Sequence, residues 1–143
     1  MTKPQLKLEN QLCFPLYACA REVVGLYTPY LKPLGLTYTQ YLVFLVLWEN
    51  EEISMSDLCK KLYLDSGTLT PLLKKLETAG YIERIRSQED ERCVWVQLTK
   101  KGNQLSEKCA NIPMQVGECL HLTEKEASVL YKTLYKLLNY EQR

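Results

Sequence analysis

The sequence has a single histidine, His121, and no two cysteines in a Cys-x-x-Cys spacing. Structural zinc sites need four cysteine or histidine ligands in suitable spacing, so this shortage predicts no metal site. The sequence also has no run of about eighteen apolar residues, and its N-terminus lacks the apolar segment of a signal peptide. These absences predict a cytoplasmic protein without a membrane partner.

Six cysteines are scattered along the chain, at positions 13, 19, 59, 93, 109 and 119. In a chain without an export signal, most of them are expected to be reduced thiols and not parts of a disulfide framework. The 143 residues are 46% hydrophobic and 24% charged, which is typical of one globular domain. No internal repeat or low-complexity segment occurs, and no motif of a bound cofactor is found.

Charge is distributed unevenly although the net charge is only +1. Residues 60–101 hold nine Lys and Arg against six Asp and Glu, a net charge of +3, and the rest of the chain has a net charge of −2. A basic middle between slightly acidic ends is consistent with a DNA-reading segment inside a dimerisation frame.

The first part of the chain has the pattern of a long amphipathic helix. Apolar residues recur at helical spacing from Leu6 to Leu31, and Pro15 interrupts the pattern. Because proline lacks a backbone donor, the main helix either begins close to Cys13 or is kinked there. Both alternatives leave backbone N–H groups without partners near the Cys13 thiol.

The centre of the chain has the pattern of a winged helix-turn-helix. A capping box at Thr37 opens a buried helix, and Ser54 opens a short one. Ser66 or Asp65 caps the next helix, in which Leu69, Leu72, Leu73 and Leu76 form one apolar stripe. Residues 81–86 and 93–98 have strand composition and enclose a charged turn, which predicts a two-stranded wing.

The C-terminal part is predicted to be helical again. One helix begins near Thr99 and ends before Pro113, and Thr123 with Glu126 forms a capping box for the last helix. Long apolar helices at both ends exceed what one small core can bury, so they predict a homodimer.

Several runs of residues carry a resemblance to a known family. They are LCFPLYACARE at 12–22, LTYTQY at 36–41, LYLDSGTLTPLLKKLE at 62–77 and EDER at 89–92. In this order they resemble the MarR family of repressors, and more narrowly its OhrR organic hydroperoxide sensors. The resemblance implies a mainly α fold with a small β-wing, namely a winged helix-turn-helix homodimer. It implies a single domain over 1–143, with DNA-binding region 36–99 and dimerisation helices in 1–35 and 100–143.

The resemblance also implies the redox site. Cys13 becomes the cysteine that reacts with an organic hydroperoxide, and Tyr27 and Tyr38 of the other subunit hydrogen-bond to it. Tyr27 lies fourteen residues beyond Cys13, roughly 20 Å along one helix, so it cannot reach the thiol of its own chain. Cys119 is expected to resolve the oxidised thiol as an intersubunit disulfide, with Cys109 or a small external thiol as alternatives. Cys19, Cys59 and Cys93 are interpreted as structural or incidental.

The predicted partner is double-stranded operator DNA with an inverted repeat. The polar face of the recognition helix suits base edges and phosphates in a major groove, and it comprises Ser66, Thr68, Thr70, Pro71, Lys74 and Lys75. Arg92, oriented by Asp90, resembles the family's minor-groove arginine. Arg84 and Arg86 are expected to face phosphates.

Other functions fit parts of the pattern. A MarR-type repressor released by a small phenolic ligand would make Cys13 incidental, and a redox regulator of virulence or biofilm genes would use the same scaffold. A thiol peroxidase would also need a reactive cysteine, but no peroxidase motif is present, so the chain is predicted not to be an enzyme. The sequence therefore predicts a peroxide-sensing repressor that leaves its operator when Cys13 is oxidised.

Overall fold

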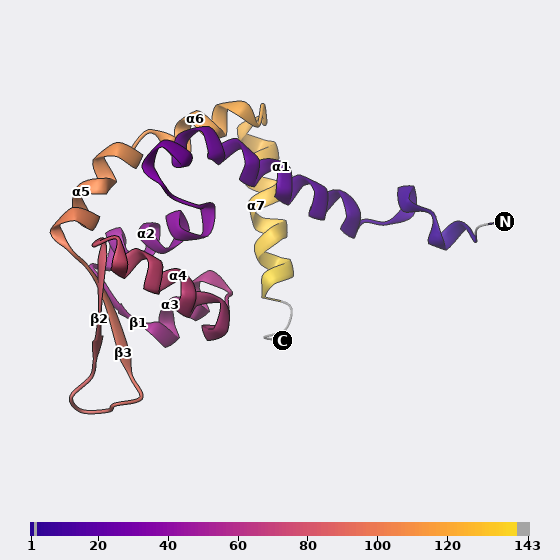
Figure 1. The fold of residues 1–143 in the computed structure, drawn as a ribbon. Helices are drawn as coiled ribbons and strands as arrows, with labels where there is room; N and C mark the ends of the chain where they lie inside the picture. Colours follow the sequence, from indigo (N-terminus) through magenta and orange to yellow (C-terminus); the bar gives the residue numbers. More distant parts are fainter. Residues whose placement is uncertain (2, 140–143) are drawn as a thin grey trace. The chain divides into compact units, whose positions relative to one another are not determined.

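The computed structural model describes residues 1 and 3–139. The chain divides into two compact units, the first ending at Ile112 and the second beginning at Pro113. The first unit contains helices α1 to α5 and a small sheet (Figure 1). The predicted dimerisation segment 100–143 extends to residues 140–143, which lie outside the described residues.

Helix α1 comprises Cys13–Leu31 and begins at the reactive-cysteine candidate itself. Pro15 lies in its first turn, where the backbone N–H groups have no partner within the helix, so the missing donor costs little. The structure therefore confirms the first of the two alternatives for this helix. The segment from Leu6 to Leu12 was expected to share the helical pattern, but here it holds a short 3-10 helix, Leu8–Asn10, preceded by another at Pro4–Leu6.

Helix α2, Tyr38–Asn50, forms the centre of the first unit's core. The Thr37 side chain accepts a hydrogen bond from the Gln40 backbone, and the Gln40 side chain accepts one from the Thr37 backbone, so the predicted capping box is present. Between α1 and α2 the chain makes a 3-10 turn, Lys32–Leu34, and turns at Gly35 with φ of 70°. This left-handed conformation favours glycine because glycine has no Cβ.

The helix-turn-helix comprises α3, Met55–Leu62, and α4, Ser66–Thr78. Ser54 caps α3 by accepting from the Asp57 backbone, and Asp65 caps α4 by accepting from the Thr68 backbone at 2.7 Å. The leucine stripe of α4 faces the core, with Leu69, Leu73 and Leu76 fully buried. Its polar face is consequently turned outward.

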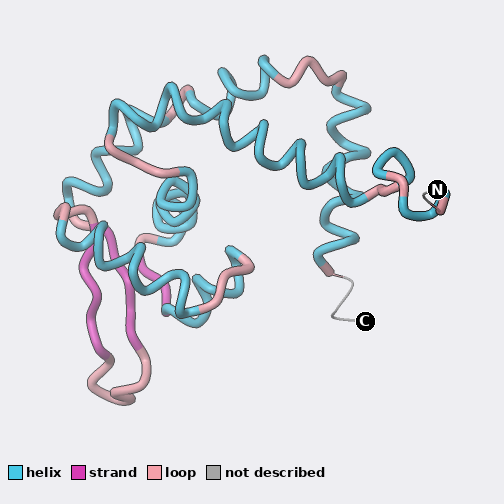
Figure 2. Tube along the Cα trace, turned by 45° about the vertical axis from the view of Figure 1, so that its right-hand side comes forward, coloured by secondary structure: helices cyan, strands magenta, loops and turns pink. Residues whose placement is uncertain are grey.

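The sheet has three strands in the order β1-β3-β2, all antiparallel. Strands β2, Ile82–Arg86, and β3, Val94–Leu98, form the predicted wing, which projects from the helices as a hairpin (Figure 2). Strand β1, Glu52–Ser54, was not predicted. Three residues are too few to show an alternating pattern, and pairing with β3 alone makes this segment a strand.

Helix α5, Lys100–Cys109, completes the first unit. Its Gly102 carbonyl accepts a hydrogen bond from the Trp48 indole at 3.0 Å. A Cβ at Gly102 would collide with the backbone carbonyl of Tyr81, so glycine is required for this close approach.

The C-terminal helices are α6, Ile112–Cys119, and α7, Glu124–Leu138. The capping box of Thr123 and Glu126 is present at the start of α7. Helix α6 was not predicted, because the preceding helix was expected to end before Pro113 and a loop to follow. Pro113 lies instead in the first turn of α6, where proline is tolerated. None of the described helices is both long enough and apolar enough to span a bilayer.

Candidate redox site and DNA-binding surface

Cys13 is exposed at the N-terminus of α1. The preceding residue, Leu12, makes no side-chain cap, so the first turn of the helix has backbone N–H groups that no capping side chain satisfies. Such N–H groups can donate hydrogen bonds to an anionic group at the start of the helix. This geometry suits a cysteine that attacks a peroxide.

Tyr27 and Tyr38 form an aromatic cluster with Tyr41 at the other end of α1. The ring centroids of Tyr27 and Tyr38 are 4.7 Å apart, and those of Tyr27 and Tyr41 are 5.6 Å apart. Burial raises the pKa of Tyr27 and of Tyr38, and the Tyr27 hydroxyl adds to the effect on Tyr38. Burial also raises the pKa of Tyr41 to about 12. The phenols are therefore protonated at neutral pH and can donate hydrogen bonds.

A pocket of about 360 Å³ lies beside this cluster. Its lining comes from α1, the 3-10 turn and the start of α2, and comprises Val24, Tyr27, Thr28, Leu31, Lys32, Gly35, Leu36, Thr37 and Tyr38. Two phenol rings and the three aliphatic side chains of Val24, Leu31 and Leu36 make most of the lining apolar. The pocket can therefore accept a small organic group next to hydroxyl donors.

The structure brings Tyr27 and Tyr38 together but does not bring Cys13 to them within one chain. Helix α1 is continuous from Cys13 to Leu31, so Tyr27 lies roughly 21 Å along the helix from Cys13. The separation expected from the sequence is thus present in the fold. Contact between the thiol and the phenols requires a second chain.

The other two candidate thiols differ in accessibility. Cys119 is exposed at the last residue of α6, and its thiol donates to the Gln115 carbonyl at 3.4 Å. Cys109 is buried in α5, and burial raises the pKa of its thiol. A buried protonated thiol condenses slowly with a sulfenic acid, because the thiolate is the nucleophile.

The polar face of α4 is exposed as predicted. Ser66, Thr68, Pro71, Lys74 and Lys75 are all exposed, and Thr70 is half-buried. The Thr70 hydroxyl donates to the Ser66 carbonyl at 2.7 Å, and its oxygen can still accept a hydrogen bond from an amino group of a base. Five exposed side chains on one face of one helix form a surface that can enter a groove.

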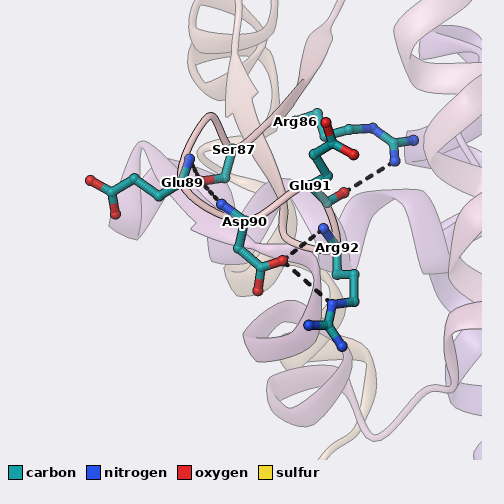
Figure 3. A network of polar contacts seen from close by, with 6 residues as sticks. All are labelled: Arg86, Ser87, Glu89, Asp90, Glu91 and Arg92. Atoms are coloured by element: carbon teal, nitrogen blue, oxygen red, sulfur yellow. Dashed lines mark hydrogen bonds and ion pairs between the residues drawn. The ribbon is translucent and has the colours of Figure 1, made fainter.

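The wing tip presents Arg92 to solvent, with its side chain 95% exposed (Figure 3). The Asp90 carboxylate accepts from the Arg92 backbone at 3.0 Å and lies 3.6 Å from the Arg92 side-chain nitrogen. Arg86 donates to the Glu91 carbonyl at 3.1 Å. Asp90 therefore directs both the backbone and the side chain of the predicted minor-groove arginine.

Arg84 lies in a different environment from the other predicted phosphate contacts. Its guanidinium donates to the Glu77 carboxylate at 3.0 Å, and its side chain is only 23% exposed. The guanidinium that was expected to face a phosphate therefore has an anionic partner within the fold.

A groove between α3 and the wing contains two polar residues, Ser56 and Lys60, that were not predicted as DNA contacts. It has a volume of about 460 Å³ and is lined by Met55, Ser56, Cys59, Lys60, Ser66, Arg92, Cys93 and Val94. Ser56 and Lys60 thus share one surface with the predicted DNA contacts Ser66 and Arg92. No motif marks Lys60. Helix α3 directly follows β1, and the pairing of β1 with β3 helps to bring α3 beside the wing.

Residues 25–109 match the family model described as transcriptional regulator SarA/Rot. The chain is 47% identical over 133 residues to the organic hydroperoxide resistance transcriptional regulator of Bacillus subtilis strain 168, covering 93% of this chain and 90% of that protein.

Two solved regulators are also similar. Reduced AbfR bound to DNA is 35% identical with a TM-score of 0.81, covering 99% of this chain and 100% of that one. Disulfide-formed AbfR is 37% identical with a TM-score of 0.66, covering 94% of each chain. The reduced form of MarR from E. coli is 30% identical with a TM-score of 0.72, covering 90% of this chain and 96% of that one.

Proposed function

The chain belongs to the SarA/Rot family of transcriptional regulators, and on this premise we propose that it represses transcription until an organic hydroperoxide oxidises Cys13. The resemblance to MarR-type hydroperoxide sensors is confirmed by the Bacillus subtilis relative and by the likeness to AbfR and MarR. The observation that carries the proposal is the exposed Cys13 at the N-terminus of α1, at the opposite end of the helix from two protonated phenols.

The proposed repressor is a homodimer built by its terminal segments, 1–35 and 100–143. An antiparallel partner helix α1 would bring the partner subunit's Tyr27 and the partner subunit's Tyr38 to Cys13, because a reversed helix aligns opposite ends. The exposed apolar side chains of α7, among them Val129, Leu130 and Tyr131, supply further surface for a dimer. Two subunits related by a two-fold axis would read an inverted repeat.

The proposed sensing step is a transfer of one oxygen atom. The Cys13 thiolate attacks an oxygen of the hydroperoxide, the O–O bond breaks, and an alcohol leaves after taking up a proton. Hydroxyl protons of the tyrosines stabilise the thiolate before the attack, and the pocket beside Tyr27 accepts the organic group. Cys13 is left as a sulfenic acid. Each subunit consumes one peroxide in this step, so no turnover is required.

The proposed second step joins two thiols. The Cys119 thiol attacks the sulfenic sulfur of Cys13 in the partner chain, an S–S bond forms, and water leaves. Cys119 is preferred to Cys109 because it is exposed and Cys109 is buried. AbfR, a relative that binds DNA in its reduced form, also has a disulfide form.

In the reduced state, the polar face of α4 would enter the major groove and Arg92 the minor groove of the operator. Bacterial operators lie in the cytoplasm, so we place the protein there. The groove between α3 and the wing adds Lys60 to the cationic surface that meets the phosphates.

A gel-shift titration tests the proposal. The reduced protein is titrated against the intergenic DNA upstream of its own gene, with and without cumene hydroperoxide, and peroxide consumption is followed in parallel. We expect binding in the nanomolar range that is lost on addition of peroxide and restored by dithiothreitol. Continued peroxide consumption with a thiol reductant would favour a peroxidase, and release by salicylate but not by peroxide would favour the phenolic-ligand alternative.

A further inference from the structure

The carboxylate of Glu77 connects the recognition helix to the wing. Glu77 lies in the last turn of α4, and one of its oxygens accepts from the Arg84 backbone N–H at 3.0 Å. Its other oxygen accepts from the Arg84 guanidinium, also at 3.0 Å. Arg84 is in the middle of β2, opposite Val96 of β3. A single side chain of α4 therefore holds both the backbone and the side chain of one wing strand.

The Glu77 carboxylate and the Arg84 guanidinium compensate each other's charge. The Arg84 side chain is largely covered, and its Nε atom is buried without a hydrogen-bond partner. Among the described residues, Glu77 makes the only ion pair recorded for Arg84. The hydrogen bonds from Arg84 lower the pKa of Glu77, so the carboxylate is ionised at neutral pH. Loss of either partner leaves a partly buried charge uncompensated.

The contact spans the two elements that are proposed to enter the DNA. Helix α4 presents the major-groove face, and β2 leads to the tip that carries Arg92. Between them the chain turns at Gly80, which has φ of 83°. The orientation of the wing relative to α4 is therefore fixed by the Glu77 contact, together with packing of Ile82 and the hydrogen bond from Tyr81 to Leu76.

We propose that Glu77 is a positioning residue for operator recognition. It aligns the wing with the recognition helix, so that Arg92 and the α4 face meet their two grooves at the same time. Arg84 serves as the anchor of this contact and not as a phosphate ligand. The proposal rests on the proposed function, because it assigns Glu77 a part in operator binding.

Glu77→Gln is the sharpest variant for a test. The amide retains the shape of the side chain, but its single oxygen cannot accept from both Arg84 donors, and its NH₂ group faces a donor. The matched control is Glu83→Gln on the same strand. Glu83 is exposed, and among the described residues its carboxylate accepts a hydrogen bond from Gln97 alone, at 3.3 Å. This variant therefore removes the same charge without touching the contact.

Operator affinity is measured for the full-length reduced wild type, Glu77→Gln, Arg92→Ala, and the double variant. We expect Glu77→Gln to lose roughly tenfold in affinity, and the double variant to bind no more weakly than the weaker single variant, because a misaligned wing cannot use Arg92. We expect Glu83→Gln to bind as wild type. Losses that multiply in the double variant, or wild-type affinity of Glu77→Gln, would overturn the proposal.

A measurement without DNA separates this proposal from the proposed function. Amide hydrogen exchange is compared in wild type, Glu77→Gln and Glu83→Gln, each free of DNA. We expect faster exchange of the wing residues in Glu77→Gln only, with unchanged exchange in α2. Equal wing exchange in all three would contradict the positioning role, whether or not the protein binds an operator.

A second variant covers the case in which Glu77→Gln does not fold. Arg84→Lys keeps the positive charge and loses the fork geometry. We expect it to weaken operator binding with an unchanged salt dependence and to speed exchange in the wing. Wild-type affinity and wild-type wing exchange in Arg84→Lys would show that a charge suffices at this position, and the proposal would be wrong.

Discussion

The phenol ring of Tyr27 packs against that of Tyr38, with the ring centroids 4.7 Å apart. Tyr27 lies about one turn before the end of α1, and Tyr38 is in the first turn of α2. Cys13 lies at the opposite end of α1, so neither ring contacts the thiol of the same chain. The pair is already assembled by packing within one subunit. A partner's thiol would therefore meet two donors whose relative positions are fixed before the dimer forms.

Cys13→Ser is expected to keep operator affinity and to lose release by hydroperoxide, because serine retains the size of cysteine without an oxidisable sulfur. Gel shifts with and without cumene hydroperoxide check this. Cys19→Ser is the control, since Cys19 is also exposed on α1 and should leave release unchanged. Release of Cys13→Ser at the wild-type dose would remove Cys13 from the mechanism.

The resolving thiol can be identified by a disulfide-linked dimer on non-reducing gels. Peroxide is expected to produce this band in wild type and in Cys109→Ser, and not in Cys13→Ser or Cys119→Ser. The reason is that Cys119 is exposed whereas burial raises the pKa of Cys109. A band that survives in Cys119→Ser but not in Cys109→Ser assigns the role to Cys109. No band in wild type assigns it to an external thiol.

Arg92→Ala is expected to weaken operator binding by about 1–3 kcal/mol, the size of one good groove contact. The guanidinium is almost fully exposed, so its loss should not affect folding, and the melting temperature should stay at the wild-type value. Fluorescence anisotropy with labelled operator measures the affinity. An unchanged affinity at physiological salt would mean that the wing tip does not enter the DNA.

Lys60→Ala tests whether the groove between α3 and the wing meets a phosphate. The loss of one phosphate contact per subunit should reduce the slope of log affinity against log salt by about 2 for the dimer. Lys108→Ala, an exposed lysine on α5, is the control and should leave the slope unchanged. A slope that does not differ between the two variants would place Lys60 outside the interface.

The tyrosine cluster predicts loss of stability in alkali. Tyr41 has a pKa of about 12 when folded, against an ordinary value of about 10, so the unfolded chain releases this proton first as the pH rises. Stability from the buried phenol is complete below about pH 10 and is lost between about pH 10 and 12. Urea unfolding across this range should show a smaller loss in Tyr41→Phe. Equal losses in both proteins would mean that other groups govern alkaline unfolding.

Local sequence determined most of the secondary structure. The capping residues Thr37, Ser54 and Thr123 each accept the backbone hydrogen bond that their positions predicted, because a cap involves residues only three apart. The leucine stripe of α4 was predicted for a similar reason, because helical periodicity relates residues only three and four apart in the sequence. Strand β1 and helix α6 were missed, because one needs a distant partner strand and the other begins at a proline.

The candidate site likewise has features that the sequence predicted and features that only the tertiary structure shows. Cys13, Tyr27 and Tyr38 were predicted as site residues from their motifs, and the length of α1 already separated the thiol from the phenols. The contact of Glu77 with Arg84, and the groove that brings Lys60 beside Arg92, were not visible in the sequence. No sequence pattern relates the residues of this contact or of this groove. Only the packing of α3, α4 and the sheet against each other brings these residues together.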